Sequence, residues 1–262
     1  MSGPIQHLLE TSAGYARGGV GATTLIARSD LVERLESLIR RWGSLYEWAA
    51  AHARANAIRG RDTLYIVPGP DDVPWVVRRL THGGLLAPLT GRRFLRVGLP
   101  RPFNELRVAE RLRELGVPTP AVLAAVIYRS GPFYKGEVAR RALENATDLA
   151  GCLFGEGLDV ARRLEAMEAA GGLVGRMHRV GLVHPDLNLR NILIEWTVTK
   201  PTAHILDLEK CRFARLGPLR RRRMLARLQR SARRFEEESG DTISAEGWKR
   251  FRKAYSESER LL

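Results

Sequence analysis

The sequence predicts an α+β fold in two parts, a β-rich first half with one embedded helix and a mostly helical second half. Three observations predict it. Short apolar runs separated by turn residues fill much of residues 63–139. One amphipathic stretch, residues 103–115, interrupts these runs. From residue 158 onward helical spacing dominates, and two short apolar runs there are followed by polar residues.

Length and composition limit the class of protein. A chain of 262 residues with 44% hydrophobic residues can bury a sizeable core, as one two-lobed domain or two small ones. Its two cysteines, Cys152 and Cys211, provide no disulfide framework and no metal-ligand spacing. No signal pattern and no apolar run of membrane-spanning length is found, so we expect a soluble cytoplasmic protein.

The net charge of +14 comes from 43 Lys and Arg against 29 Asp and Glu. It favours an anionic partner: nucleic acid, an acidic membrane face or a phosphorylated substrate. No nucleic-acid-binding module is recognisable, so nucleic acid is not expected. The alternative is that the arginine excess reflects a GC-rich genome.

Residues 1–55 are predicted to form an N-terminal extension. Residues 1–30 are rich in small residues and are expected to be loosely ordered. The Arg17–Thr24 stretch resembles a phosphate-binding loop, but Ala22 stands where its lysine must be and no apolar strand precedes it. Apolar residues spaced by three and four predict one amphipathic helix over 31–57. This helix packs on a domain or, alternatively, rests on a membrane surface.

Residues 56–142 are predicted to form the β-rich lobe. Strands at 63–67 and 74–78 make a hairpin around a Pro- and Gly-rich turn. The embedded helix ends at Gly116, and two prolines then prevent its continuation. Strands at 121–128 and 134–139 follow, and the link to the second lobe falls near residues 140–143.

Residues 143–262 are predicted to form the helical lobe. A helix over 158–180 ends at Gly181, and a polar loop with two short strands follows. An arginine-rich helix over 219–235 is then expected to break at 236–240 before a last helix over 245–255.

The polar loop carries the most specific pattern. It is H-P-D-L-N-L-R-N-I-L-I, from His184 to Ile194, and I-L-D-L-E-K follows from Ile205 to Lys210. Protein-kinase-like enzymes use this order: a base that orients the acceptor hydroxyl, an Asn on Mg²⁺, and an Asp on Mg²⁺ after another strand. The sequence therefore predicts a protein-kinase-like two-lobed fold that uses ATP and Mg²⁺.

Four segments together resemble the 3-deoxy-D-manno-octulosonic acid (Kdo) kinases within the lipopolysaccharide kinases. That family carries H-x-D-L-N-x-x-N-I-L-[LI] and D-F-D-[KR] segments, and D-L-E-K at Asp207–Lys210 is a variant of the second. It also has a basic strand running into Gly-Gly, as at 77–85, and an R-P-x-x-E helix followed by G-[LV]-P-x-P, as at 101–105 and 116–120. The resemblance covers about residues 56–235.

The resemblance implies ATP-dependent phosphorylation of a sugar hydroxyl, on Kdo attached to lipid A, in lipopolysaccharide core biosynthesis. It implies a cytoplasmic enzyme with peripheral contact at the inner face of the bacterial inner membrane. The arginine-rich helix is either a solvated face or a contact for lipid A phosphates and anionic lipids.

The pattern assigns roles in the second lobe. Asp186 is the expected catalytic base, and Asn191 with Asp207 is expected to hold Mg²⁺. Asn188 binds the γ-phosphate or holds Asp186 in place. His184 is expected to brace the loop. Glu209, which with Leu208 replaces the Phe-Gly of the usual motif, assists a second ion or holds its own loop.

The nucleotide side of the site is expected in the first lobe. Arg78 stands where protein kinases carry the lysine that grips the phosphates, and Glu105 is its expected partner. Arg79 replaces Arg78 if the strand is shifted by one residue. Gly60 and Arg61 lie in a turn with a single glycine and are expected to cover the phosphates.

Four readings compete. The first is the Kdo kinase, and the second is another sugar or small-molecule kinase, such as a heptose kinase. The third is a protein kinase of the same fold. The fourth is a nucleotide-binding pseudokinase, which the missing lysine favours and the intact Asp186, Asn191 and Asp207 oppose.

Overall fold

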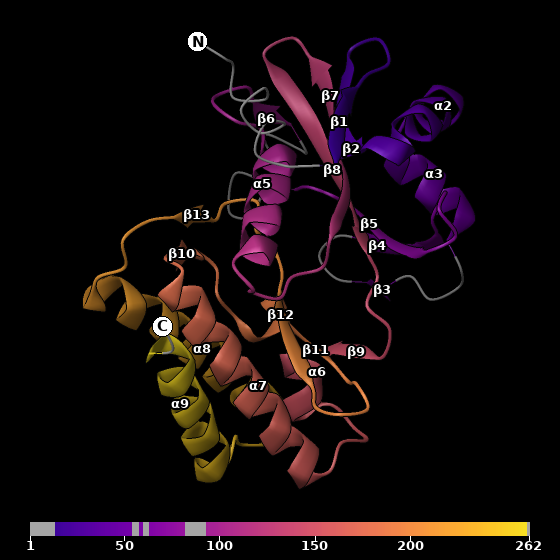
Figure 1. Ribbon diagram of the computed structural model, residues 1–262. Helices are drawn as coiled ribbons and strands as arrows, with labels where there is room; N and C mark the ends of the chain where they lie inside the picture. The colour runs from indigo at the N-terminus through magenta and orange to yellow at the C-terminus, as the bar shows by residue number, and fades with distance from the viewer. Residues whose placement is uncertain (1–13, 54–57, 60–62, 82–92, 261–262) are drawn as a thin grey trace. The chain divides into compact units, whose positions relative to one another are not determined.

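The computed structural model describes residues 14–53, 58–59, 63–81 and 93–260. The chain divides into two compact units, one made of Met1–Glu110 and Ala121–Ala142, the other of Arg111–Pro120 and Leu143–Leu262. The first unit holds the large sheet and the second is mainly helical (Figure 1). The predicted β-rich first part and helical second part are confirmed.

The first unit is built on an antiparallel sheet that runs β1-β2-β7-β8-β5-β4-β3 among the described residues, with β6 paired to β8. The predicted hairpins are present as β4–β5 and β7–β8. The strands are β1 (Tyr15–Gly18), β2 (Thr23–Arg28), β3 (Ile58–Arg59), β4 (Thr63–Pro68), β5 (Pro74–Arg79), β6 (Phe94–Leu95), β7 (Val122–Ser130) and β8 (Phe133–Arg141).

Strands β1 and β2 correct a prediction, because they lie within residues 1–30, which were expected to be loosely ordered. They form the β1–β2 hairpin, and β2 pairs with β7. Leu25, Ile26 and Ala27 are completely buried, which stabilises the strand despite its small neighbours. The glycine-rich stretch is the hairpin turn, with Gly21 at φ 57°, and residues 15–53 pack within the first unit instead of extending from it.

The predicted helix over 31–57 is broken. A 3₁₀ turn, η1 (Ser29–Leu31), leads into α2 (Val32–Trp42), and α3 (Leu45–His52) follows. Gly43, at φ 79°, ends α2, and the hydroxyl of Ser44 caps α3 by accepting the Glu47 N–H at 3.0 Å. Residues 54–57 lie outside the described residues.

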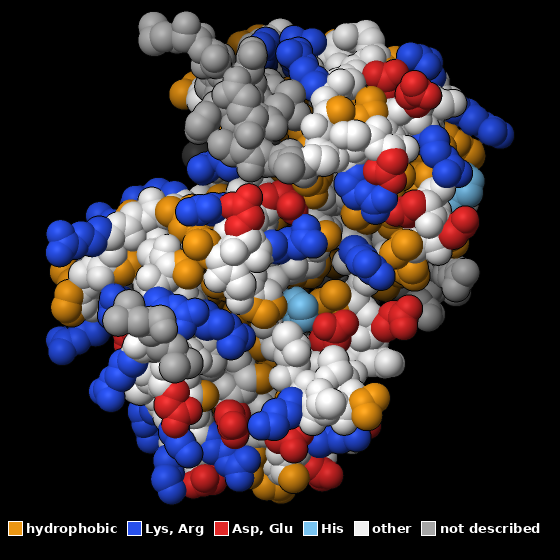
Figure 2. Space-filling view, viewed as in Figure 1, with side chains coloured by type: hydrophobic (Ala, Val, Ile, Leu, Met, Phe, Trp, Pro, Cys, Tyr) orange, Lys and Arg blue, Asp and Glu red, His pale blue; other side chains and the backbone are white. Residues whose placement is uncertain are grey.

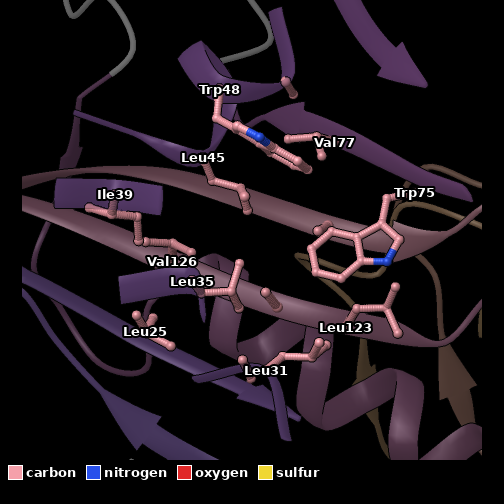
Figure 3. Close-up of a cluster of buried hydrophobic side chains, with 14 of the residues drawn as sticks. Leu25, Leu31, Leu35, Ile39, Leu45, Trp48, Trp75, Val77, Leu123 and Val126 are labelled. Carbon is pink, nitrogen blue, oxygen red and sulfur yellow. The ribbon is translucent and has the colours of Figure 1, made fainter. Parts of the chain in front are cut away.

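The apolar stripe of α2 faces the protein core. Leu31, Leu35 and Ile39 are at most 4% exposed and pack with Trp48 and Trp75 in one hydrophobic cluster (Figure 3). The alternative that this helix rests on a membrane is therefore wrong, since the surface it would insert is already buried.

The embedded helix is confirmed as α5 (Arg101–Glu114). Phe103, Leu106, Ala109 and Leu112 lie along one face and are completely buried. Gly116, at φ 69°, ends it, and the Val117 N–H returns to the Leu112 carbonyl at 2.8 Å. The α5 helix thus passes from the first unit into the short segment that belongs to the second.

The second unit contains two small sheets, β12-β11-β9 and β10-β13, beside its helices. Two hydrogen bonds attach the 111–120 segment to this unit: the Ile205 N–H donates to the Pro118 carbonyl at 3.0 Å, and the Thr119 hydroxyl donates to the Ile205 carbonyl at 2.8 Å. The elements are β9 (Ala146–Asp148), α6 (Leu149–Phe154), α7 (Val160–Arg179), β10 (Leu182–Val183), η2 (Leu189–Asn191), β11 (Ile192–Glu195), β12 (Thr202–Ile205), β13 (Arg212–Phe213), α8 (Pro218–Ser239) and α9 (Ala245–Arg260).

Glycines let α7 and α9 pack closely. A Cβ at Gly171 would lie 2.2 Å from the Phe251 carbonyl oxygen, and one at Gly175 would lie 2.5 Å from that of Tyr255. Any larger residue would push the helices apart. The α8 helix continues through Glu236 and ends at Gly240, at φ 77°, so the predicted break at 236 is one turn too early.

We expect unfolding to depend on the titration of His178. This side chain is 1% exposed, and its Nδ1 lies 2.9 Å from the Tyr255 hydroxyl. Burial, with a smaller effect of Arg221, lowers the pKa of His178 from 6.5 to about 4. Because the unfolded chain binds this proton more readily, stability is full above about pH 6.5 and falls as the pH drops towards 4.

Thermal unfolding measured at steps between pH 7 and 4 checks this. The difference between the two pKa values corresponds to roughly 3 kcal/mol, or a fall in Tm of about 5–10 °C. A His178→Gln protein should show a smaller fall over the same interval. An unchanged slope in that variant would contradict the assignment to His178.

Candidate active site

The loop between β10 and β11 is held by the side chain of Asn188. Its Oδ1 accepts the backbone N–H groups of Arg190 at 3.0 Å and Asn191 at 3.1 Å, which caps η2. Its Nδ2 donates to the carbonyl of Asp186 at 3.0 Å. Of the two predicted roles of Asn188, these contacts favour holding Asp186 in place.

Asn191 meets the same carbonyl. Its Nδ2 donates to the oxygen of Asp186 at 2.8 Å, and only an NH₂ group can make that bond. Because Nδ2 makes this bond, the amide oxygen Oδ1 is the atom of the side chain that can bind a cation. An amide oxygen is a ligand that Mg²⁺ accepts.

His184 is completely buried, and its ring contacts the loop at two backbone groups. Its Nε2 lies 2.9 Å from the Leu206 carbonyl, and its Nδ1 lies 3.3 Å from the backbone N–H of Asp186. A carbonyl only accepts and an N–H only donates, so the ring is neutral with its proton on Nε2. Burial lowers the pKa of His184, although the Leu206 carbonyl and the carboxylates of Asp207 and Asp186 oppose this.

Leu206 joins the loop to the second motif. While its carbonyl accepts from His184, its N–H donates to the Asn191 carbonyl at 2.9 Å. Asp207 follows directly, at φ 59°, a left-handed conformation that Asp and Asn tolerate better than most residues. Asp207 therefore directly follows a residue whose N–H is bonded to the Asn191 carbonyl and whose carbonyl is bonded to the His184 ring. Glu209 is buried, with Lys210 at 3.8 Å, and its predicted roles stay open.

In the first unit, Arg78 of β5 contacts Glu105 of α5, as the sequence predicts. The Arg78 Nη2 lies 2.6 Å from Oε2 of Glu105, which is 0% exposed. Arg140, near the end of β8, contacts the other oxygen of the same carboxylate. The contact between Arg78 and Glu105 is confirmed, while their binding of a nucleotide remains a prediction.

Arg140 is the residue that sequence reasoning missed. It was assigned to the link between the lobes, whereas β8 extends through Arg141. In the β5–β8 register Arg140 lies opposite Val76 and Val138 lies opposite Arg78, so both arginines are on one face of the sheet. The alternation of side chains along a correctly extended strand is the signal that could have found it.

Arg79 contacts a different set of residues from Arg78. Its Nε lies 3.2 Å from Glu137 and its Nη2 lies 2.9 Å from Glu47, while its guanidinium stacks 4.1 Å from the ring centre of Tyr46. These contacts fasten the start of α3 to the sheet. The alternative in which Arg79 takes the place of Arg78 is therefore not supported, because a strand alternates its faces.

Gly60 and Arg61 lie outside the described residues, so their predicted role stays a prediction. The backbone on either side forms the β3–β4 pair, with Arg59 opposite Thr63.

Asn191 and Asp207 suit Mg²⁺. The described residues hold no cluster of three or more His, Cys, Asp or Glu side chains around a metal position. Mg²⁺ in phosphotransferases usually takes one or two protein oxygens and completes its shell with phosphate oxygens and water. One carboxylate and one oriented amide oxygen are such a set.

A surface rich in arginine lies next to the loop. The α8 basic surface is defined by exposed arginines on α8 and the segment before it, and residues 210–235 contain no Asp or Glu. Figure 2 shows Lys and Arg side chains at the left edge of the second unit, where α8 begins in Figure 1. The arginines are Arg212, Arg215, Arg220, Arg222, Arg223, Arg227, Arg230, Arg233 and Arg234.

The α8 helix also supports the loop directly. The Ser231 hydroxyl accepts the Leu189 N–H at 3.3 Å, and the Met224 sulfur lies 3.3 Å from the backbone nitrogen of His184. The guanidinium of Arg190 lies 5.2 Å from the ring centre of Phe235.

Among the described helices, none has the length and apolar character needed to span a bilayer.

Comparisons with known proteins agree on one family. The model of the lipopolysaccharide kinase (Kdo/WaaP) family matches residues 32–255. The 3-deoxy-D-manno-octulosonic acid kinase of Vibrio vulnificus (strain YJ016) is 32% identical over 186 residues, 70% of this chain and 75% of the relative. That of Actinobacillus succinogenes is 31% identical over 213 residues, 79% of this chain and 87% of the relative.

A solved structure supports the fold. The structure titled "WaaP in complex with acyl carrier protein" superposes with a TM-score of 0.53 and 20% identity, covering 85% of this chain and 87% of that one. At this identity the likeness concerns the fold. The predicted resemblance and the kinase-like fold are both confirmed.

Proposed function

This chain belongs to the lipopolysaccharide kinase (Kdo/WaaP) family, and on that premise we propose that it transfers the γ-phosphate of ATP to a hydroxyl of Kdo on a lipid A-linked acceptor. It is a kinase of lipopolysaccharide core biosynthesis. The observation that carries the proposal is the loop in which Asn188 and Asn191 both bind the carbonyl of Asp186.

The residues divide the reaction between them. Asp186, whose backbone is held on both sides, accepts the proton of the attacking hydroxyl. Arg78 and Glu105 align the nucleotide phosphates. Asn191 and Asp207 would hold Mg²⁺, which when bound neutralises charge on the phosphates. Catalysis then rests on position and charge, because phosphoryl transfer needs no covalent help from the protein.

A transfer assay tests the function. Purified protein is incubated with Mg²⁺ and γ-labelled ATP and with Kdo-lipid A, lipid A lacking Kdo, a heptose-containing core, or a generic protein acceptor. Label on Kdo-lipid A alone is the expected result. Label only on the heptose core or the protein would replace the proposed acceptor, and nucleotide binding without transfer to any acceptor would favour a pseudokinase.

We also propose that the α8 basic surface binds anionic lipid and brings the enzyme to its lipid-anchored acceptor. Five arginines recur every three or four residues and so form one stripe along α8. The stripe consists of Arg220, Arg223, Arg227, Arg230 and Arg234. Of these, Arg234 has an ion pair among the described residues, with Glu238 at 2.7 Å. Cations near an anionic leaflet contribute about 1 kcal/mol each.

Removing the charge of this stripe should weaken vesicle binding. A variant with Gln at Arg220, Arg223, Arg227 and Arg230 is expected to partition to phosphatidylglycerol-containing vesicles less well, on the order of 1000-fold, as measured by co-sedimentation. A control with Gln at Arg17, Arg34, Arg41 and Arg252, which are also exposed, has the same net charge. Equal losses in both proteins would mean that only net charge matters.

A further inference from the structure

We propose that Arg190 is an acceptor-binding residue, whose guanidinium pairs with a carboxylate of the sugar that receives the phosphate. The inference rests on the proposed function, because the acceptor proposed there is the sugar acid Kdo. It adds a contact that selects the acceptor to the same loop that carries the proposed catalytic base.

Arg190 lies in the same turn of the loop as Asp186. The amide of Asn188 joins the two residues: its Oδ1 accepts the Arg190 N–H at 3.0 Å, and its Nδ2 donates to the Asp186 carbonyl at 3.0 Å. The hydroxyl that gives its proton to Asp186 belongs to the acceptor sugar, so the rest of that sugar must lie over this loop. Arg190 is therefore placed to meet a group a few bonds away from the reacting hydroxyl.

Aromatic rings restrain the Arg190 side chain. Its guanidinium lies over the ring of Phe235 on α8, 5.2 Å from the ring centre. Phe235 in turn stacks on Phe154, the last residue of α6, with the ring centres 5.8 Å apart and an angle of 17° between the planes. A cation–π contact uses one face of a guanidinium and leaves its N–H edge for hydrogen bonds. The side chain is thus ordered before a ligand arrives, which lowers the entropic cost of binding.

The charge of Arg190 is not neutralised within the described residues, where its guanidinium makes no hydrogen bond and no ion pair. The side chain is exposed. Two of the three acids at the end of α8 have other partners: Glu236 accepts the Ile243 N–H at 2.9 Å, and Glu238 pairs with Arg234 at 2.7 Å. An exposed, ordered guanidinium without an acidic partner favours an anionic ligand.

A carboxylate distinguishes the proposed acceptor from a neutral sugar. Kdo is an acid that is ionised at neutral pH, whereas a heptose has no carboxyl group. The planar fork of a guanidinium can donate to both oxygens of a carboxylate at once. Pairing with Arg190 would therefore favour a sugar acid over a neutral sugar at the site of transfer.

The experiment compares two acceptors in neutral detergent micelles with Mg²⁺ and γ-labelled ATP: Kdo-lipid A, and the same molecule with its carboxyl groups converted to methyl esters. The native protein is expected to show kcat/KM about 10- to 100-fold lower for the ester. Arg190→Met should lower kcat/KM for Kdo-lipid A by a similar factor and treat both acceptors nearly alike. Its KM for ATP should stay within about twofold of the native value. Arg190→Lys should be intermediate, because it keeps the charge without the fork.

Arg162→Met is the matched control. Arg162 is another exposed arginine of the same unit, and its guanidinium lies 5.5 Å from the ring centre of Trp196. This variant should discriminate between the two acceptors as strongly as the native protein. Phe235→Leu removes the ring beneath Arg190 but keeps the charge, so it should lose part of the discrimination. Thermal unfolding checks that each variant is folded, and Arg190→Gln gives the same comparison if Arg190→Met does not fold.

A purely structural role for Arg190 would give a different result. If the side chain only packed α8 against the loop, or paired with a phosphate of lipid A, Arg190→Met would lower transfer to both acceptors by the same factor. Either result would overturn the proposal, and so would a raised KM for ATP without a change in acceptor preference. A native protein that labels the acid and the ester equally would remove the role of Arg190 and keep the proposed function. A native protein that labels neither acceptor would refute the proposed function itself.

Discussion

Replacing Asp186 with Asn is expected to lower the rate of phosphate transfer about 10²- to 10⁴-fold while changing ATP affinity by less than about threefold. The loop should survive the change, because the contacts that hold Asp186 use its backbone N–H and carbonyl. Only the carboxylate that accepts the hydroxyl proton is lost. Single-turnover transfer from γ-labelled ATP, with separate measurement of nucleotide binding, gives both quantities.

Asp241→Asn is the matched control for this prediction. Asp241 is an exposed acid of the same unit, with Arg163 at 3.9 Å, so it reports the effect of losing one carboxylate from the surface. Transfer by Asp186→Asn at the rate of the control would exclude Asp186 as the base.

The second large effect is expected for Asp207→Asn. Transfer should fall roughly 100- to 1000-fold at limiting Mg²⁺, because an amide binds the ion more weakly than a carboxylate. Higher Mg²⁺ should restore part of the rate. The fold should be kept, since Asn also tolerates the left-handed backbone of residue 207, at φ 59°. Rates measured across a Mg²⁺ titration, with Mn²⁺ binding followed by electron paramagnetic resonance, check this.

Asp72 provides the control for backbone strain. It has a similar φ of 61° and belongs to the first unit, so Asp72→Asn repeats the substitution in the same conformation at a residue outside the loop. If Asp207→Asn showed the same Mg²⁺ dependence as Asp72→Asn, Asp207 would not be a ligand.

Local patterns predicted much of the fold and the loop. The α5 helix, the two hairpins and the segment from His184 to Asn191 each depend on residues close in sequence. The Arg78–Glu105 contact was also predicted, because the protein-kinase pattern pairs a cation on this strand with a glutamate on the next helix. Where neighbouring residues decide the structure, spacing and turn chemistry are enough.

The failures have different causes. The spacing of apolar residues continues across Gly43, so it did not reveal that Ser44 starts a new helix. The six residues of α6 are too few to show a period. The contact of Arg140 with Glu105 depends on the register between β5 and β8, which are about 60 residues apart in the chain, and no local pattern contains that register.

The membership of Arg111–Pro120 in the second unit limits how this chain can be cut or recombined. Ile205 has its backbone N–H and carbonyl bonded to Pro118 and Thr119, so a gene fragment beginning at residue 143 would lack partners for a buried strand. A single crossover between relatives would also separate co-adapted residues. Functional chimeras should instead exchange 111–120 together with 143–262, so that crossovers within α5 and after Pro120 accompany the one after Ala142.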